Sequence, residues 1–308
     1  MSTLNLEMTK EDFKQFVETL QNEITQKMQQ IDPTLKVTND RWERSDHAGA
    51  PGGGGLTRYH QGEIFESAGV NTSTIFGAID PKFASQLPGG KTDGKTDGNT
   101  DLWATGISLI IHPRNPHVPT VHANFRLIHQ GERVWLGGGA DLTPYYPYPE
   151  DFHYFHKVWQ DACAPYGCYE WMKKECDQYF TNHHRGNEMR GIGGIFFDHF
   201  NTGDLVKDIH LSKSLASKFI ESYFPIVAKR KSVVWSQQEE DFQLHRRGRY
   251  VEFNLIHDRG TLFGLKTNGR VESILISLPP RVKYTYNYQP LAQSPQEKMM
   301  QYYLPTNW

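Results

Sequence analysis

The stretch TVHANFRLIHQGERVWLGGGADLTPYY, residues 120–146, decides the fold that we expect for this 308-residue chain. Its first half carries polar side chains at every second position, so they share one face of a predicted strand. These side chains are His122, Asn124 and Arg126. A second strand, 133–136, runs into three glycines and then Asp141. The stretch therefore brings an imidazole, an amide, a guanidinium and a carboxylate to a backbone with little side-chain bulk.

Strand-like segments form two groups along the chain, and helical patterns lie before and between them. The expected strands are 103–112, 118–129, 133–136, 250–257, 261–267 and 271–278. The expected helices are 9–30, capped by Thr9, and then 150–162, 169–184 and 204–229. Turns at Gln130-Gly131 and Asn268-Gly269 predict hairpins. Hairpins imply antiparallel pairing, so the sequence predicts an α+β fold.

No Pro/Ser-rich linker divides the chain, so one domain spanning 1–308 is the simplest organisation. The glycine run APGGGG at 50–55 predicts a flexible loop. The segment KTDGKTDG at 91–98 repeats a tetrapeptide without apolar residues. This composition predicts a disordered surface insertion, to which we assign no function.

Composition argues against several partners and locations. The net charge of −2 gives no electrostatic reason to bind nucleic acid or an anionic membrane. Apolar runs such as 107–111 are too short for a transmembrane segment. Acidic residues near the start predict neither a secretory signal nor a transit peptide. Three cysteines without a C-x-x-C pair favour a reducing, cytoplasmic location.

Motifs for nucleotide binding, serine hydrolysis and zinc proteolysis are missing from the sequence, namely G-x-G-x-x-G, the P-loop, G-x-S-x-G and H-E-x-x-H. Arginines are more informative, because a guanidinium binds a carboxylate through two parallel hydrogen bonds. Surface salt bridges are the ordinary role of an arginine. Arg126, however, lies between Phe125 and Leu127 on a predicted strand, where a charge favours a binding role.

Two further residues are candidates for acid–base chemistry. Asp141 follows GGGA and precedes Leu-Thr-Pro, where an aspartate commonly caps a turn. The glycines also let a ligand approach the backbone closely, so a catalytic role stays open. His122 shares a strand face with Arg126, and an imidazole there suits proton transfer near neutral pH. Most of the 14 histidines are expected to be hydrogen-bonded structural residues.

Four long segments resemble the oxygen-dependent coproporphyrinogen III oxidase family. They are WATGISLIIHPRNPHVPTVHANFRL at 103–127, WLGGGADLTPYY at 135–146, CDQYFTNHHRGNEMRGIGGIFFD at 176–198 and RRGRYVEFNLIHDRGTLFGLKTNGRVESILISLPPRVKY at 246–284. The KTDG repeat departs from the family pattern. So does an extra residue in HHRGNEMRG, which leaves His183 and His184 as alternatives for one family histidine.

The resemblance implies oxidative decarboxylation of the ring A and ring B propionates of coproporphyrinogen III to vinyl groups. Molecular oxygen would be the oxidant, and the products would be protoporphyrinogen IX, carbon dioxide and hydrogen peroxide. The resemblance further implies a large antiparallel sheet flanked by helices on both sides, no organic cofactor, and a homodimer joined through about 250–285.

The resemblance also implies residue roles. His122 would be the general acid, and Asp141 would hold or deprotonate the pyrrole N–H groups. The propionates would be bound by Arg126, Arg190, Arg247 and Arg270, with Arg126 also counted as catalytic. The other substrate contacts would be Ser108, Asn124, Asn268 and Gly269. A divalent metal is an open question, with His112, His122, His156 and His184 as its candidate ligands.

Two alternatives remain open on the sequence. A tetrapyrrole-binding or carrier protein would use the same arginines but would need no acid–base group. A histidine–metal oxygenase or hydrolase acting on another aromatic acid would use the histidines instead.

Overall fold

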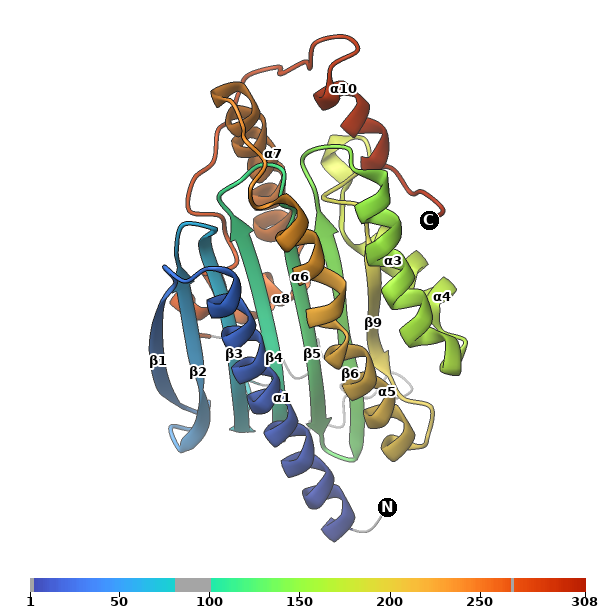
Figure 1. The fold of residues 1–308 in the computed structure, drawn as a ribbon. Helices are drawn as coiled ribbons and strands as arrows, with labels where there is room; N and C mark the ends of the chain where they lie inside the picture. Colours follow the sequence, from blue (N-terminus) through green and yellow to red (C-terminus); the bar gives the residue numbers. More distant parts are fainter. Residues whose placement is uncertain (1–2, 81–100, 267–268) are drawn as a thin grey trace.

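A seven-stranded antiparallel sheet forms the centre of the structure, a computed structural model that describes residues 3–80, 101–266 and 269–308. The strands lie in the order β1-β2-β3-β4-β5-β6-β9 (Figure 1). Their bounds are β1 (Lys36–Ser45), β2 (Pro51–Gln61), β3 (Phe65–Ala78), β4 (Asp101–Pro113), β5 (Thr120–Gln130), β6 (Arg133–Thr143) and β9 (Gly194–Phe200). The α+β prediction with one large antiparallel sheet is therefore confirmed.

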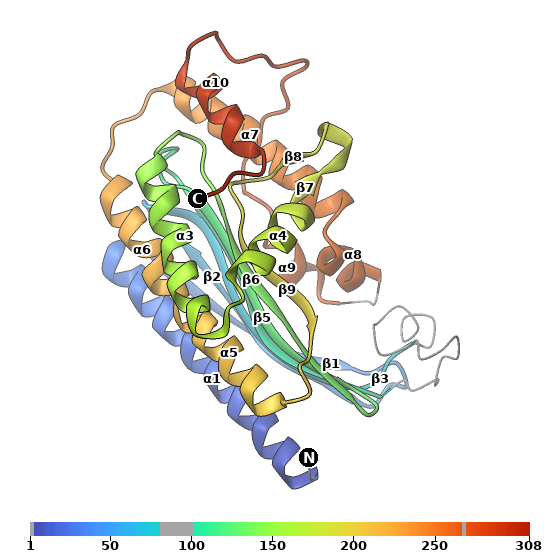
Figure 2. The same cartoon turned by 90° about the vertical axis from the view of Figure 1, so that its right-hand side faces the viewer.

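Helices cover both sides of this sheet. One layer holds α1 (Thr3–Ile31), α3 (Pro149–Cys163), α5 (Leu205–Ser217) and α6 (Phe219–Arg230). The other side holds α7 (Gln237–Ile256), α8 (Arg259–Lys266) and α9 (Val271–Leu275), as the edge-on view in Figure 2 shows. The remaining elements are α4 (Tyr169–Tyr179), α10 (Pro295–Met300) and a small hairpin of β7 (Thr181–Asn182) and β8 (Glu188–Met189).

The main core lies between the sheet and the α1 layer. Helix α1 buries the stripe predicted from its 3.6-residue period, formed by Phe13, Val17, Leu20, Ile24 and Met28. Strand β5 turns its odd-numbered residues toward this layer, and these are at most 1% exposed: Val121, Ala123, Phe125 and Leu127. The even-numbered residues of β5 point to the opposite side, where His122, Asn124, Arg126 and Ile128 are only partly buried. One strand thus serves a core on one face and a polar site on the other.

Several predicted element boundaries are wrong. Helix α1 begins at Thr3 rather than after Thr9, and the expected helix 204–229 is two helices, α5 and α6. The glycine run at 50–55 is not a loop, because Pro51 starts β2. There the ring of Trp42 lies against Gly55, where a Cβ atom would be only 2.6 Å from a ring carbon. Glycine is therefore required by packing in this strand.

The second group of expected strands, 250–257, 261–267 and 271–278, is helical instead. A capping box formed by Ser236 and Glu239 starts α7, which continues through Ile256. The β-branched and aromatic residues of 250–257 suggested a strand, but tertiary contacts outweigh such preferences. Helices α8 and α9 flank the expected Asn268-Gly269 turn, so that hairpin is not formed. Asn268 and the segment 91–98 lie outside the described residues.

Candidate active site

The polar face of the sheet, on the side of α7 to α9, holds most of the predicted site residues. Ser108, Asn124 and Arg126 are partly buried there, and Ser108 stands directly opposite Asn124 in the β4–β5 pairing. Arg126 pairs with Gly106 on one side and Gly137 on the other. A Cβ atom on Gly137 would lie 2.8 Å from Nε of Arg126, so this glycine makes room for the guanidinium.

His122 and Asp141 stand opposite each other on β5 and β6. Nδ1 of His122 lies 2.9 Å from Oδ1 of Asp141. Arg190 donates to both carboxylate oxygens, from Nε to Oδ2 at 2.9 Å and from Nη2 to Oδ1 at 2.7 Å. Burial alone would raise the pKa of Asp141, but the charge of Arg190 and the hydrogen bonds from both neighbours hold that pKa below its usual value. Asp141 is therefore an anion at neutral pH.

Asp141 does not reach the accessible face of the sheet, because it is 1% exposed and both of its oxygens accept hydrogen bonds. The expectation that it contacts pyrrole N–H groups directly is therefore not supported by this arrangement. His122 is the accessible member of the cluster, with 22% of its side chain exposed. Since Asp141 holds Nδ1, the other ring nitrogen, Nε2, is the one left for substrate.

Arg190 lies in the interior of the protein and packs against aromatic rings. It is 3% exposed, and its guanidinium carbon lies 4.1 Å from the ring centre of Phe180 and 4.5 Å from that of Tyr250. Burial would lower the pKa of Arg190, but Asp141 raises it above its ordinary value. In this structure the guanidinium of Arg190 is buried and already paired with Asp141, and its contact with a substrate carboxylate stays a prediction.

Arg247 likewise lies in the interior of the protein. It is fully buried, donates from Nη1 to Glu66 at 2.7 Å and from Nη2 to the carbonyl of Pro113 at 2.9 Å, and thereby ties α7 to β3 and β4. The contact of Arg247 with a propionate likewise stays a prediction. Burial would raise the pKa of Glu66, but Arg247 and Arg281 hold it below its usual value. This carboxylate is therefore charged beside Arg247.

Two of the four predicted arginines remain accessible. Arg126 has a 33% exposed side chain and donates to Asp198 at 2.8 Å. Arg270 has a 26% exposed side chain and donates to Asp40 at 2.6 Å. Each guanidinium thus already donates to one carboxylate, the chemical group that a propionate would present.

Arg259 and Asp198 belong to the same region and were missed by the sequence analysis. Nη2 of Arg259 lies 3.6 Å from Asp198, and the guanidinium lies over the ring of Tyr179 at 4.7 Å. Phe196, two positions before Asp198 on β9, stacks on Tyr179 with ring centres 4.3 Å apart. The alternation of Phe196 and Asp198 within GGIFFD was the signal that could have identified this strand face.

The four candidate metal ligands are not brought together. His112 bonds to Thr120 and the carbonyl of Ser277, whereas His156 bonds to Tyr169 and the carbonyl of Ile192. Burial lowers the pKa of both histidines to about 3. His122 pairs with Asp141, as described above.

His184 lies elsewhere, 2.7 Å from His257 and 3.0 Å from Glu252. His183 contacts Asn187 instead, at 3.0 Å. Within the described ranges, no group of three or more His, Cys, Asp or Glu side chains is arranged to hold a metal ion. The predicted four-histidine metal site is therefore not formed within one chain.

Gly269 ends the α8–α9 connection, where its N–H donates to the carbonyl of Gly264 at 2.8 Å. Ser273 of α9 is hydrogen-bonded to Thr57 of β2 at 2.7 Å, and its carbonyl accepts from Asn71 of β3 at 3.2 Å. These bonds fasten α9 to the polar face at the β2–β3 side. Arg270, the N-cap residue of α9, is thereby held at a defined place relative to the sheet.

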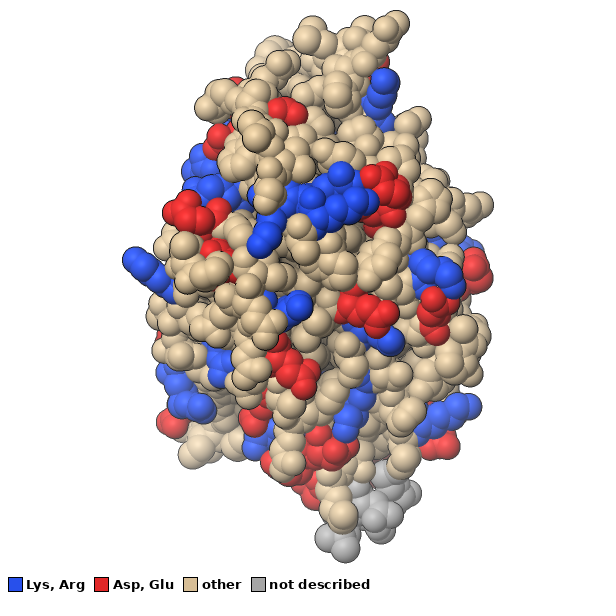
Figure 3. Space-filling model, viewed as in Figure 1, with Lys and Arg blue, Asp and Glu red and all other residues tan. Residues whose placement is uncertain are grey.

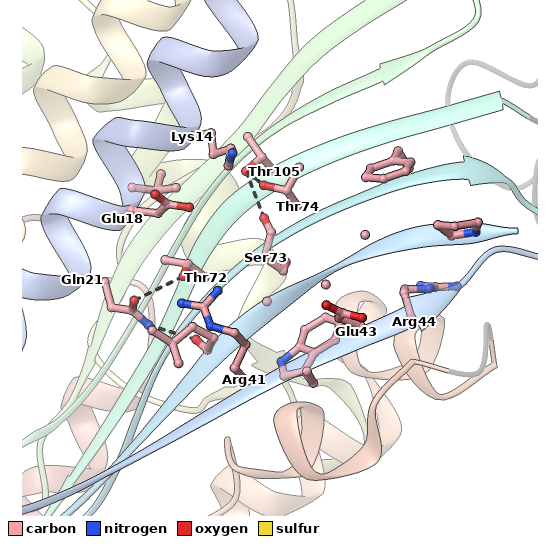
Figure 4. A pocket seen from close by; sticks show the side chains of 18 of the residues that line it. Lys14, Glu18, Gln21, Arg41, Glu43, Arg44, Thr72, Ser73, Thr74 and Thr105 are labelled. Atoms are coloured by element: carbon pink, nitrogen blue, oxygen red, sulfur yellow. Dashed lines mark hydrogen bonds between the residues drawn. The ribbon is translucent and has the colours of Figure 1, made fainter.

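A separate hollow of about 940 Å³ lies on the α1 side, between α1 and β1 to β4. None of the predicted site residues lines it. Figure 4 shows Lys14, Glu18 and Gln21 of α1 on one side and Arg41 and Glu43 of β1 on another. Charges of both signs occur here and over the whole helix-covered surface in Figure 3. The hollow therefore contains neither the Arg126–Asp198 pair nor the His122–Asp141 pair of the polar face.

Within the described part of the chain, no helix is both long and apolar enough to cross a membrane. The three cysteines, Cys163, Cys168 and Cys176, are buried and free.

Accessible guanidinium groups on the same sheet face as an accessible imidazole, itself backed by a buried carboxylate–guanidinium pair, are typical of an enzyme that handles an acidic substrate by proton transfer. The family model for coproporphyrinogen III oxidase matches residues 12–308, so the chain belongs to this family. Its members are oxidoreductases that carry out an oxidative decarboxylation in porphyrin and haem biosynthesis. The family resemblance inferred from the four sequence segments is thereby confirmed.

Proposed function

We propose that the protein converts the ring A and ring B propionates of coproporphyrinogen III to vinyl groups, with molecular oxygen as electron acceptor. Protoporphyrinogen IX, carbon dioxide and hydrogen peroxide would be released. The observation that carries this proposal is that the His122–Asp141 pair and the accessible guanidinium of Arg126 lie on the same sheet face. It supplies a proton donor and a carboxylate-binding group in the same region.

The chemical balance explains why one acid is needed. For each propionate, a C–H bond next to the pyrrole breaks and its electron pair passes with the hydrogen to oxygen. The bond to the carboxylate then breaks, carbon dioxide leaves, and its electron pair forms the vinyl double bond. Oxygen has gained a hydride equivalent and requires one proton to become hydrogen peroxide. We assign that proton to Nε2 of His122, because Asp141 holds Nδ1 and stabilises the imidazolium.

The reaction would need no organic cofactor, because the electron-rich reduced pyrrole can itself give electrons to oxygen. The protein's contribution would be binding, orientation and proton supply. Arg126 would bind one propionate and Arg270 another, with Arg259 as a further accessible cation. Ser108, Asn124 and Gly269 would lie along the macrocycle. Gly137 would let the guanidinium of Arg126 lie close to the sheet backbone under the substrate.

We also propose a cytoplasmic homodimer joined through 250–285. Exposed large apolar side chains concentrate in and just beyond this segment: Leu255, Ile256, Leu265, Val271, Val282, Tyr284, Tyr286 and Leu291. An apolar patch of this kind suits an isologous contact between two copies.

Analytical ultracentrifugation tests the contact. We expect a dimer for the wild type and a shift toward monomer for Ile256→Asp, whereas Val234→Asp, at a more exposed position outside the segment, should stay dimeric.

The decisive experiment is incubation of the purified protein with coproporphyrinogen III in four conditions, with or without oxygen and with or without a chelator. We expect the loss of two carboxyl groups, detected by mass spectrometry, and stoichiometric peroxide in both aerobic samples. Turnover without oxygen would refute the choice of oxidant. Turnover that disappears with chelator would show that a metal is required. Bound but unchanged substrate in every sample would leave a tetrapyrrole-binding protein.

A further inference from the structure

Asn254 on α7 holds the edge of the Arg190 guanidinium that faces away from Asp141. Its Oδ1 accepts from Nη1 of Arg190 at 2.8 Å, and Asn254 itself is 3% exposed. Arginine carries only donors, so the atom facing it must be the amide oxygen. The amide nitrogen then donates to Oγ of Ser277 at 3.3 Å, which fixes the orientation of the amide.

The face of α7 that carries Asn254 is shaped around Arg190. Tyr250, Phe253 and Asn254 occupy positions i, i+3 and i+4, which lie on the same side of a helix. The guanidinium carbon lies 4.5 Å from the ring centre of Tyr250 and 4.9 Å from that of Phe253. The two rings pack on the cation, and the amide meets it with a directional hydrogen bond. One helix therefore sets both the depth and the rotation of Arg190.

We infer that Asn254 is a positioning residue for the reaction: its amide oxygen holds Arg190 in the plane in which it pairs bidentately with Asp141, and thereby sets how Asp141 holds His122. The kinetic part of this inference rests on the proposed function. A two-point contact between guanidinium and carboxylate depends on coplanarity. With its far edge released, Arg190 can rotate and weaken one of the two bonds, so that more of the Asp141 charge acts on His122.

Other groups also face this cluster, and they are the same in all variants below. Cys176 on α4, Tyr250 on α7 and Asp258 after α7 interact electrostatically with Arg190 or Asp141. His112 on β4 interacts with Arg190 and bonds to the carbonyl of Ser277. Neutral His112 adds no charge, and Asp258 is satisfied by Thr261 and Tyr179. A change at Asn254 therefore acts mainly through Arg190.

The test compares Asn254→Leu with Gln243→Leu. Gln243 is a buried amide on the same helix, and it donates to the carbonyl of Pro113 at 3.1 Å, away from Arg190. For Asn254→Leu we expect kcat to fall about tenfold with KM within about twofold of wild type. The alkaline limb of the kcat profile should move to higher pH, because a more exposed Asp141 charge favours protonated His122. Gln243→Leu should lose stability but leave the pH profile unmoved.

A second variant separates positioning from general damage. Asn254→Asp keeps an oxygen acceptor for Nη1 of Arg190, so its kcat should exceed that of Asn254→Leu. Equal kcat values for the two variants, or an unmoved alkaline limb for Asn254→Leu, would overturn the inference. So would the same pH shift in Gln243→Leu.

A spectroscopic measurement distinguishes failure of this inference from failure of the proposed function. NMR titration of His122 in wild type and Asn254→Leu needs no turnover. A higher titration midpoint in the variant supports positioning even if the wild type proves inactive on coproporphyrinogen III. An unchanged midpoint refutes positioning even if the wild type is active.

Discussion

The two faces of the central sheet are made from the same strands but differ in what holds them. On the α1 face, β5 contributes Phe125 and Leu127 to a closely packed core, where contacts are apolar and largely non-directional. On the opposite face, the same strand contributes His122 and Arg126, whose contacts are hydrogen bonds and ion pairs of defined geometry. The difference teaches that stability and chemistry can be changed separately, one residue apart along one strand.

The largest expected effect is a loss of stability in acid, caused by protonation of buried histidines. Burial lowers the pKa of His60, beside α1, to about 4 and that of His112 and His156 to about 3, against an ordinary value of 6.5. The unfolded chain therefore binds more protons in acid, so this stability is present above about pH 6.5 and is lost as the pH falls toward 4 and 3. We expect the free energy of unfolding to drop by roughly 5 kcal/mol between about pH 7 and pH 5.

Urea unfolding at several pH values checks this prediction. Replacing His60 by Gln, which cannot be protonated, should make the dependence shallower. An unfolding free energy that is flat between about pH 7 and pH 5 would show that these histidines are not held neutral.

The second largest effect is expected for Asp141→Asn, because this substitution removes the charge that balances buried Arg190. We expect turnover to fall about 10³-fold, since His122 loses its anionic partner. The free energy of unfolding should fall by about 3–5 kcal/mol, since a buried cation is left unpaired. Asp12→Asn breaks an exposed pair with Lys213 and serves as the control, with no measurable change in either quantity. A fully active Asp141→Asn enzyme would remove Asp141 from the proton-donor cluster.

Neighbouring substitutions on β5 test the comparison most directly. Phe125→Ala should lower the free energy of unfolding by about 3–5 kcal/mol, because Phe125 is 1% exposed in the core. Its activity at low temperature should stay near wild type. Asn124→Ala should cost less than about 1 kcal/mol but raise KM. Thermal unfolding and steady-state kinetics of both variants measure these changes in stability and in KM. The reverse pattern would mean that the two faces have been assigned wrongly.

The smallest effect is expected when the substitution of an accessible arginine is compared with that of a buried one. Arg126→Leu should raise KM about tenfold with little loss of stability, because it removes a carboxylate ligand from a partly exposed site. Arg247→Leu should lower stability and leave KM nearly unchanged in the folded fraction, because Glu66 loses its buried partner. KM from initial rates and urea unfolding provide both values. A raised KM in a stable Arg247→Leu protein would return Arg247 to the substrate site.

The sequence predicted the structure most accurately where the spacing of apolar side chains matches the observed burial. The stripe of α1 and the alternation of β5 both follow from side-chain spacing, and both faces were assigned correctly from 120–130 alone. The prediction was least accurate in 250–278, where strand-forming side chains belong to helices packed on the sheet. Local preference cannot show that Tyr250 and Phe253 need helical spacing to surround Arg190.

The sequence by itself determined the family, the strand that carries His122 and Arg126, and the position of Asp141 near the next strand of the same sheet. Only the tertiary structure decided which charges are accessible. Arg190 and Arg247 cannot be told from Arg126 by residue type, yet their partners Asp141 and Glu66 lie 49 and 181 positions away in the chain. Burial removes the water that would otherwise solvate such cations, so each must pair inside the protein. In this structure that pairing makes both arginines buried supports of the polar face.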